Sequence, residues 1–312
     1  MKVPVATVAW VLSLAIAGLA GAPTSPEAGP AARPADKNPG HLKMALVNMK
    51  CLYSDSADAA ANRKNIQANL DRHLYFVDQV SAQGAEFAGF PELSINGYHF
   101  SANMTWLSLT GPEVKALRQK AVERGVYISA GIAEQDADGK RWNTQFVIGA
   151  QGEIVGWHHK IWLTKEKGFV EAGTDHNVLA VKGVKMGIST CADGTDQKNL
   201  QALADSGARI IYGPHANTTG GTTAGWYKFR AAWGGPGGWI AQLKVHAALH
   251  NQAGLYDPEF KPPVAGDANS GWAGGAWFIG PDGQTLAQMP PSTQKSDSRE
   301  CTLIYNIPIS SR

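Results

Sequence analysis

Cysteine and charge are both scarce in this sequence. The chain has three cysteines among 312 residues, charged residues make up 17% of it, and the formal net charge is +2. So few cysteines exclude a disulfide framework, and their spacing is not that of a zinc site. Because the charge is small and the basic residues do not cluster, we expect no nucleic-acid partner. A hydrophobic share of 44% predicts a globular protein with a large core.

Long apolar runs are also rare, and the clearest one lies at the N-terminus. Met1-Lys2 precedes the run "VATVAWVLSLAIAGLAGA", which ends in a small-residue cleavage pattern. Residues 1–22 therefore read as a secretory signal peptide, with an uncleaved membrane anchor as the alternative. We expect an exported protein, periplasmic or secreted, without stable membrane association after cleavage. Residues 23–41, rich in Pro and Ala, are expected to form a flexible linker, and 42–312 one domain.

Strand and helix patterns mostly alternate from residue 42 onward, which predicts an α/β protein with helices layered on sheets. The expected strands are residues 42–49, 85–92, 126–135, two antiparallel strands within 141–160, 184–190, 208–217, a hairpin within 271–289 and a last strand from Cys301. The expected helices are residues 58–82, 111–125 and 196–207. The Gly- and Trp-rich stretch 218–239 has no clear period.

Cys191 stands where a nucleophile is expected, in the stretch "VKMGISTCADGTDQ". The thiol would leave the carboxyl end of a strand and face the N-terminus of the next helix. That position is expected to lower its pKa and to favour the thiolate. The N–H of Ala192 is a candidate donor to an oxyanion. A buried structural cysteine is the alternative.

A cysteine nucleophile needs a base, and two other segments offer charged groups at strand ends. Glu92 follows the apolar run "FAGFP", and Lys160 ends the stretch "GWHHK". An exposed charge at a strand edge is the alternative for each. Histidine is the other common base, but none stands in a recognisable protease context. The histidines considered are His158, His159, His215, His246 and His250.

Taken together, these three segments resemble the nitrilase superfamily of carbon–nitrogen hydrolases. That family has Glu in a Pro-Glu context, Lys in a His-x-Lys context and Cys after a short apolar strand, in this order. The resemblance covers roughly residues 42–310 and includes "NQAG" and "GPDGQTLAQ" near the C-terminus. It implies a four-layer α-β-β-α sandwich and a catalytic triad of Glu92, Lys160 and Cys191. It also implies a small amide substrate, no cofactor, no metal and a homodimer or higher homo-oligomer.

The resemblance extends to a second glutamate and to substrate contacts. "KEKGFVEAG" matches a family pattern and makes Glu166 the candidate, with Glu171 as competitor. The family's Pro-Glu after the cysteine is absent from "CADGTDQKN", which weakens any substrate assignment. The Trp-Glu of nitrilases proper is absent too, which favours amide over nitrile cleavage. Candidate substrate-binding residues are Tyr98, Trp162, Ala192, Asp193, His215 and Asn217.

Other functions stay open at this point. An N-carbamoyl amidohydrolase, a nitrilase or an acyltransferase would use the same triad, and a non-catalytic binding protein would not need it. His246 and His250 stand at i and i+4, as zinc ligands on a helix can, although a third ligand is not evident. Cys51 and Cys301 are expected to be buried and inert, or else bridged to each other.

Overall fold

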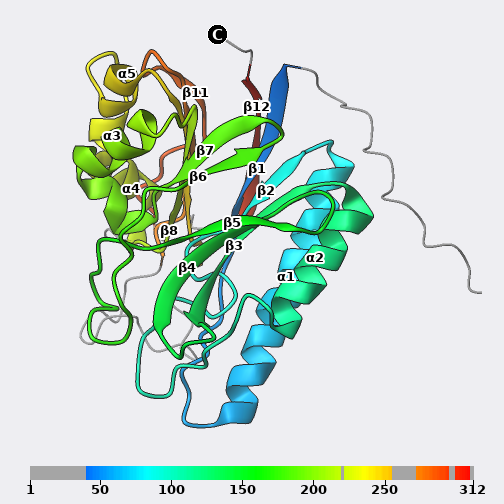
Figure 1. Ribbon diagram of the computed structural model, residues 1–312. Helices are drawn as coiled ribbons and strands as arrows, with labels where there is room; N and C mark the ends of the chain where they lie inside the picture. The colour runs from blue at the N-terminus through cyan, green and yellow to red at the C-terminus, as the bar shows by residue number, and fades with distance from the viewer. Residues whose placement is uncertain (1–39, 219–220, 255–271, 295–298, 310–312) are drawn as a thin grey trace, which may run out of the picture. The chain divides into compact units, whose positions relative to one another are not determined.

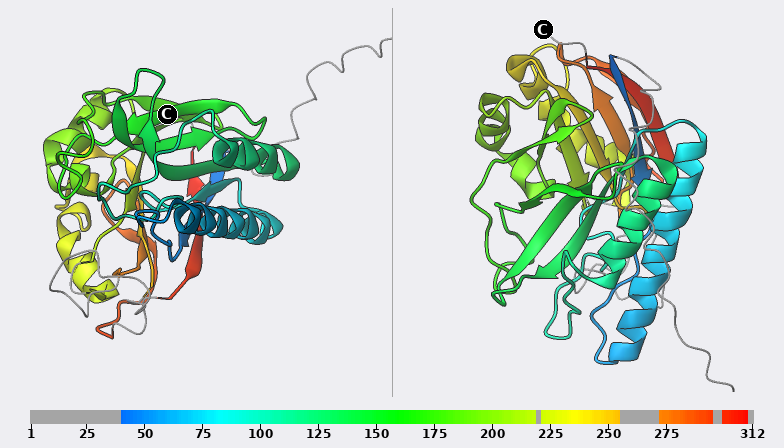
Figure 2. Two further views of the ribbon diagram at one scale, coloured as in Figure 1. Left: turned by 90° about the horizontal axis from the view of Figure 1, so that it is seen from below. Right: turned by 45° about the vertical axis from the view of Figure 1, so that its right-hand side comes forward.

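The structure, a computed structural model, describes residues 40–218, 221–254, 272–294 and 299–309. Residues 1–39, with the expected signal peptide and most of the expected linker, lie outside these ranges. Two six-stranded sheets pack face to face, and helices cover the outer side of each (Figures 1 and 2). The predicted four-layer α-β-β-α sandwich is confirmed.

The first sheet is built around three parallel strands, β1, β2 and β3. In spatial order its strands are β12 (Cys301–Pro308), β1 (His41–Asn48), β2 (Phe87–Gly89), β3 (Tyr127–Gln135), β4 (Arg141–Ile148) and β5 (Ile154–His159). The remaining strands pair antiparallel.

The second sheet repeats this plan with β7, β8 and β9 in parallel. In spatial order its strands are β11 (Thr285–Gln288), β10 (Ala276–Ile279), β9 (His246–Asn251), β8 (Ile210–His215), β7 (Val184–Ile188) and β6 (Val178–Val181). Both faces of the parallel strands are covered, so these strands are nearly continuous apolar runs. Ligands of such sheets bind beyond the carboxyl ends of the strands.

Three apolar layers hold the sandwich together. The layer between the sheets contains, among others, Leu46, Phe87, Met186, Tyr212 and Phe278, all at most 1% exposed. A second layer joins the first sheet to α1 (Ala59–Ala82) and α2 (Pro112–Arg124). A third joins the second sheet to α3 (Gln197–Asp205), α4 (Thr223–Phe229) and α5 (Trp239–Leu243).

The helix ends follow local sequence signals. The Asp58 side chain caps α1 by accepting from Ala60 N at 2.9 Å. Pro112 opens α2, and Gly125 ends it in the left-handed conformation, at φ 63°. Both helices therefore form where the sequence predicts them, within one or two residues.

Two expectations about local structure are wrong. His246 and His250 lie on strand β9, not on a helix, and His250 contacts Val47 O and the Tyr212 hydroxyl, each at 2.9 Å. The zinc-helix alternative therefore has no structural basis. Strand β6 (Val178–Val181) was not predicted.

The stretch 218–239 contains α4, a 3-10 helix (η3, Ala231–Trp233) and the first residue of α5. Cys51 and Cys301 are both free, so the bridge between them is not formed. Among the described residues, none of the helices combines the length and the apolarity that crossing a membrane requires.

Candidate active site

Glu92, Lys160 and Cys191 are brought together at one end of the two sheets. Glu92 follows β2, Lys160 follows β5, and Cys191 opens a 3-10 helix (η1, Cys191–Thr195) just after β7. Glu92 and Lys160 are fully buried, and Cys191 is 8% exposed. Three segments that are far apart in the sequence thus supply one cluster of reactive groups.

The loop that carries Glu92 is held in place from two sides. On α1, Asn69 donates to a backbone carbonyl of the loop at 2.9 Å, and His73 contacts the Ser94 hydroxyl at 2.8 Å. On β3, Gly131 approaches so closely that a Cβ there would lie 2.3 Å from a backbone nitrogen of the loop. The backbone of Glu92 therefore has little freedom to move.

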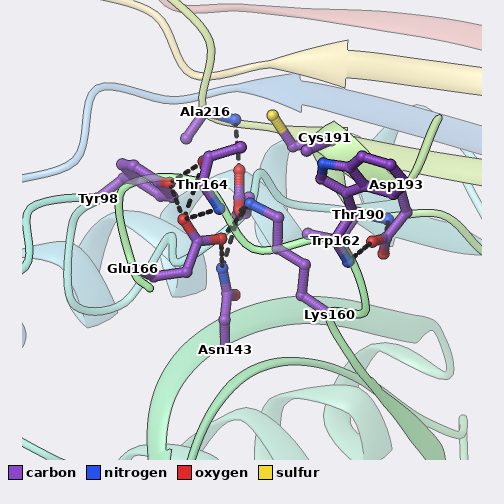
Figure 3. A network of polar contacts seen from close by, with 12 residues as sticks. Tyr98, Asn143, Lys160, Trp162, Thr164, Glu166, Thr190, Cys191, Asp193 and Ala216 are labelled. Carbon is purple, nitrogen blue, oxygen red and sulfur yellow. Dashed lines mark hydrogen bonds and ion pairs between the residues drawn. The ribbon is translucent and has the colours of Figure 1, made fainter. Parts of the chain in front are cut away.

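Lys160 lies between two carboxylates (Figure 3). Its Nζ donates to Glu92 Oε1 at 2.7 Å and forms an ion pair with Glu166. Asn143 bridges the same carboxylates, donating to Glu92 at 2.8 Å and to Glu166 at 3.5 Å. The Tyr98 hydroxyl donates to Glu166 at 2.5 Å. The cluster contains one basic and two acidic side chains, all of them fully buried.

The three charged groups of this cluster have different pKa values. Burial opposes the charge of Lys160, but the carboxylate of Glu92 and its other anionic neighbours keep its pKa well above the usual value. Burial also opposes ionisation of Glu166, yet Lys160 and the hydrogen bonds keep its pKa at about 2. For Glu92, burial prevails and raises the pKa, and the charge of Glu166 adds to this. Glu166 therefore balances Lys160, and Glu92 is the carboxylate that takes a proton more readily.

The turn that carries Cys191 is strained and firmly held. Cys191 has φ 47°, a left-handed conformation that costs a non-glycine residue about 1–2 kcal/mol. Across the start of η1, Thr190 N donates to Asp193 Oδ2 at 3.2 Å and Asp193 N donates to the Thr190 carbonyl at 3.0 Å. Arg230 donates to the carbonyls of Cys191 and Gly194, at 2.5 and 2.8 Å. These bonds offset the strain and fix the direction of the thiol.

The expectation of a lowered thiol pKa at Cys191 is wrong. Burial raises its pKa to about 12, and the negative charge of Glu92 adds to the rise, against the opposing effects of Lys160 and Arg230. The helix that follows is a five-residue 3-10 turn, and α3 begins only at Gln197. The resting state is therefore a neutral thiol beside a carboxylate.

Asp193 connects the turn of the cysteine to the loop of the lysine. Its Oδ1 accepts from the backbone N–H groups of Ile161 and Trp162, at 3.0 and 2.7 Å. Its Oδ2 contacts His158 Nε2 at 2.8 Å. Asp193 is 1% exposed and does not line the pocket. The expectation that it contacts substrate is therefore corrected: it positions the residues on either side of it.

A pocket of about 350 Å³ opens onto Cys191. It is lined by Tyr98, Trp162, Thr164, Lys165, Cys191, Ala192, Thr195, Ala216, Asn217, Thr218, Phe229, Arg230 and Trp272. The residues expected to contact substrate that line it are Tyr98, Trp162, Ala192 and Asn217. Four of its thirteen lining residues are aromatic, and two of these, Trp162 and Phe229, are 50% and 46% exposed.

His215 lies behind the pocket and not on its wall. It is fully buried on β8, its Nδ1 contacts Gly213 O at 2.8 Å, and its ring packs edge-on against Trp226. The expectation of a substrate contact at His215 is corrected, because the side chain points into the core under α4.

Several residues of the site were not predicted. Asn143 had a detectable signal, because it is a polar residue inside the buried strand "RWNTQFVI". Arg230 and the backbone N–H of Ala216, which donates to Glu92 Oε2 at 3.0 Å, had none. Glu171, the competitor of Glu166, is half-exposed and its carboxylate lies 3.9 Å from Lys140 Nζ. The buried cluster thus contains Glu166 and not Glu171.

Comparison with known sequences identifies the family. The family model described as "Carbon-nitrogen hydrolase" matches residues 45–311. A nitrilase from Pyrococcus abyssi is 32% identical over 153 residues, which are 47% of this chain and 58% of the relative. A formamidase from Bradyrhizobium sp. is 29% identical over 128 residues, 39% of this chain and 37% of the relative. The chain thus matches little more than half the length of the first curated relatives.

Comparison with solved structures gives the same fold. An amidase from Nesterenkonia sp. AN1 aligns with a TM-score of 0.68 at 20% identity, over 86% of this chain and 91% of that one. A glutamine-dependent NAD+ synthetase from Acinetobacter baumannii aligns with a TM-score of 0.64 at 19% identity, over 85% and 45%. The family match, the fold and the buried Glu–Lys–Cys cluster agree, and the chain belongs to the carbon–nitrogen hydrolase family of the nitrilase superfamily.

Proposed function

We propose that this chain hydrolyses a carbon–nitrogen bond of a small amide through a thioester on Cys191. The observation that carries the proposal is the buried cluster of Glu92, Lys160 and Glu166 beside a thiol that lines a pocket. The Nesterenkonia amidase has been solved with the acetamide moiety of fluoroacetamide added covalently at its active-site cysteine. That adduct supports a cysteine nucleophile in a protein of this fold.

Glu92 is the proposed general base, and its Oε2 is the oxygen with capacity for the proton. Oε1 already accepts from Lys160 and Asn143, whereas Oε2 accepts only the neutral N–H of Ala216 among the described residues. A carboxylate oxygen has two acceptor sites. A base with a raised pKa suits proton transfer near neutral pH.

The steps follow from these positions. Glu92 takes the proton of Cys191 as the sulfur attacks the amide carbon, and the oxyanion that forms is stabilised by Lys160 and the N–H of Ala192. The C–N bond breaks, and Glu92 returns its proton to the leaving ammonia or amine. Water then gives a proton to Glu92 and attacks the thioester carbon. The C–S bond breaks, Glu92 returns that proton to the sulfur, and the acid leaves as the carboxylate with its remaining proton released to solvent. Glu166 holds Lys160 charged throughout.

The pocket favours amides with an apolar acyl group. Tyr98, Trp162, Phe229 and Trp272 contribute four aromatic side chains to its wall, and a pocket of this size holds a group larger than acetyl. The named relatives include a nitrilase, a formamidase and an ω-amidase, so their names do not select one substrate. We propose a primary amide with an aliphatic or aryl side chain.

Ammonia release by residues 23–312 tests the proposal. The panel contains acetamide, butyramide, benzamide, N-carbamoyl-β-alanine and benzonitrile, each with the wild type and Cys191→Ala. Release from butyramide or benzamide that is lost in Cys191→Ala is the expected result, together with an acyl mass on Cys191 after rapid quenching. Release that survives Cys191→Ala would contradict the thioester. Hydroxamate formation with added hydroxylamine, in place of hydrolysis, would indicate an acyltransferase.

A further inference from the structure

Arg230 is a buried cation with unusual partners. It follows α4, is 2% exposed, and lies between aromatic rings, with its guanidinium carbon 4.7 Å from the Phe229 centroid and 5.9 Å from that of Trp233. The guanidinium makes no ion pair with a carboxylate among the described residues. Its two terminal nitrogens donate instead to the carbonyls of Cys191 and Gly194.

The carbonyl of Cys191 belongs to the same peptide group as the N–H of Ala192. A trans peptide is planar, and its C=O and N–H point in opposite directions. Arg230 therefore determines the direction of the Ala192 N–H when it holds the Cys191 oxygen at 2.5 Å. Ala192 lines the pocket beside the thiol, at the start of η1, where N–H groups have no partner within the helix.

This peptide follows Cys191, which has the left-handed φ of 47°. A flip of the peptide, by rotation about ψ of Cys191 and φ of Ala192, would turn the carbonyl toward the side where an oxyanion forms. Two other bonds of the turn do not involve the carbonyl of Cys191. Thr190 N donates to Asp193 Oδ2 at 3.2 Å, and Trp233 Nε1 donates to Gly194 O at 2.9 Å. Among the described residues, Arg230 is the side chain that donates to the carbonyl of Cys191.

We propose that Arg230 is a positioning residue that orients the Ala192 N–H as an oxyanion donor by holding the Cys191 carbonyl. This inference rests on the proposed function. The cation also polarises the peptide group, which makes its N–H a stronger donor. A role as anchor for a substrate carboxylate fits less well, because both terminal nitrogens already donate to backbone oxygens.

Amide hydrolysis and alkylation, two reactions of the Cys191 thiol, distinguish the proposed positioning role of Arg230 from a purely structural role. Amide hydrolysis passes through an oxyanion, whereas alkylation by iodoacetamide displaces iodide and forms none. We expect Arg230→Lys and Arg230→Gln to lower kcat for the best amide of the panel about a hundredfold, the usual cost of one oxyanion donor. KM is expected to change less than threefold, and the alkylation rate of Cys191 less than tenfold.

Two control variants accompany these measurements. Trp233→Phe removes a bond to Gly194 but none to Cys191, and it is expected to lower kcat less than tenfold. Arg124→Lys alters an exposed arginine paired with Asp78, and it is expected to keep wild-type kcat. If Arg230→Gln does not fold, the kinetics of Arg230→Lys alone test the inference, because this variant keeps a buried cation.

Three results would overturn the inference: equal losses of hydrolysis and alkylation, wild-type kcat in Arg230→Lys, or a loss in Trp233→Phe as large as in Arg230→Lys. A wild type that releases no ammonia from any amide contradicts the proposed function itself. An active wild type beside an equally active Arg230→Lys contradicts only the role of Arg230.

Discussion

At the scale of single residues, the proposed chemistry depends on two buried glutamates in unequal surroundings. Glu166 accepts from Tyr98 and pairs with Lys160, so burial does not prevent its ionisation. Glu92 shares the same lysine, but its pKa is raised. The lysine is thus neutralised mainly by one carboxylate, and the other is left free to exchange a proton with Cys191.

The two candidates for the second glutamate make a matched pair of substitutions. Glu166→Gln leaves Lys160 with one carboxylate, which should hold Glu92 more firmly ionised and make it a weaker base. We expect kcat to fall about a hundredfold and the free energy of unfolding to fall by about 3 kcal/mol. Glu171→Gln, at a half-exposed position, should change neither. Ammonia release and urea unfolding of both variants test this, and equal effects would contradict the assignment.

The pKa of Glu92 determines how the proposed activity should fall on the acid side of its pH profile. The base must be ionised to accept the thiol proton, so activity is lost as pH falls through the pKa of Glu92. That pKa lies above 4.5 because burial disfavours the carboxylate. We therefore expect kcat/KM to decline already above pH 4.5, and Glu92→Gln to reduce it by about 10²- to 10⁴-fold at neutral pH. A profile that stays flat down to pH 4.5 would argue against Glu92 as the base.

At the scale of elements, the site depends on how the 3-10 helix after β7 is joined to the loop after β5. Asp193 makes this connection with both of its oxygens, to two backbone N–H groups and to His158. Cys191 and Lys160 follow strands of different sheets, so their relative position depends on contacts of this kind. A carboxylate inside the turn can therefore affect catalysis without contacting substrate.

Asp193→Asn tests this connection. An amide nitrogen in place of one oxygen would face either His158 Nε2 or backbone N–H groups, and at least one acceptor would be lost in a buried site. We expect the free energy of unfolding to fall by about 1–3 kcal/mol and kcat to fall at least tenfold. Asp196→Asn, three residues away, is the control, because Asn caps α3 as well as Asp does. Equal stability of the two variants would contradict the prediction.

At the scale of the whole molecule, the sandwich buries several histidines in neutral form. Burial lowers the pKa of His73 to about 4 and that of His250 to about 3. Each hydrogen-bonds to a backbone carbonyl and to a hydroxyl, and neither contacts a carboxylate among the described residues. Their neutral state is therefore a condition for the folded state.

The consequence is a loss of stability in mild acid. Unfolded histidine has a pKa of about 6.5, so below that pH the unfolded chain binds protons that folded His73 and His250 cannot. Stability is complete above pH 6.5 and declines as pH falls. For His73 the loss reaches about 3 kcal/mol by pH 4. Urea unfolding of Cys191→Ala between pH 7 and 4 should show this decline, with a smaller slope when His73→Gln is added. An unchanged slope would contradict it.

Export of the protein and its assembly into a homo-oligomer are both predictions from the sequence. The apolar run of residues 1–22 leads us to propose cleavage after Ala22 and a periplasmic or secreted enzyme. Amino-terminal sequencing of protein from the extracellular or periplasmic fraction should begin at Pro23. Light scattering tests the homo-oligomer that the family resemblance implies.

The sequence alone predicted most of the elements and the three central residues of the site. Glu92, Lys160 and Cys191 each end or follow an apolar strand, so each has a local signal that needs no knowledge of its neighbours in space. Asn143 and Arg230 have their roles only because strands and helices from other segments bring them beside these residues. No local pattern in "KFRAAW" indicates a contact with Cys191.

The predictions that were wrong failed for the same reason, because they depended on contacts between segments far apart in the sequence. Asp193 and His215 stand close in sequence to pocket residues, but the turn of η1 and the face of β8 direct their side chains away from it. The thiol pKa was expected to follow from a helix N-terminus, and burial together with Glu92 reversed its direction. The sequence by itself determined the fold class and the proposed reacting groups, because strand periodicity and short motifs are local. Tertiary structure decided the pKa values of the site, the residues that hold it in place and the lining of the pocket. The reason is that burial and electrostatic interaction depend on distances between segments far apart in the chain.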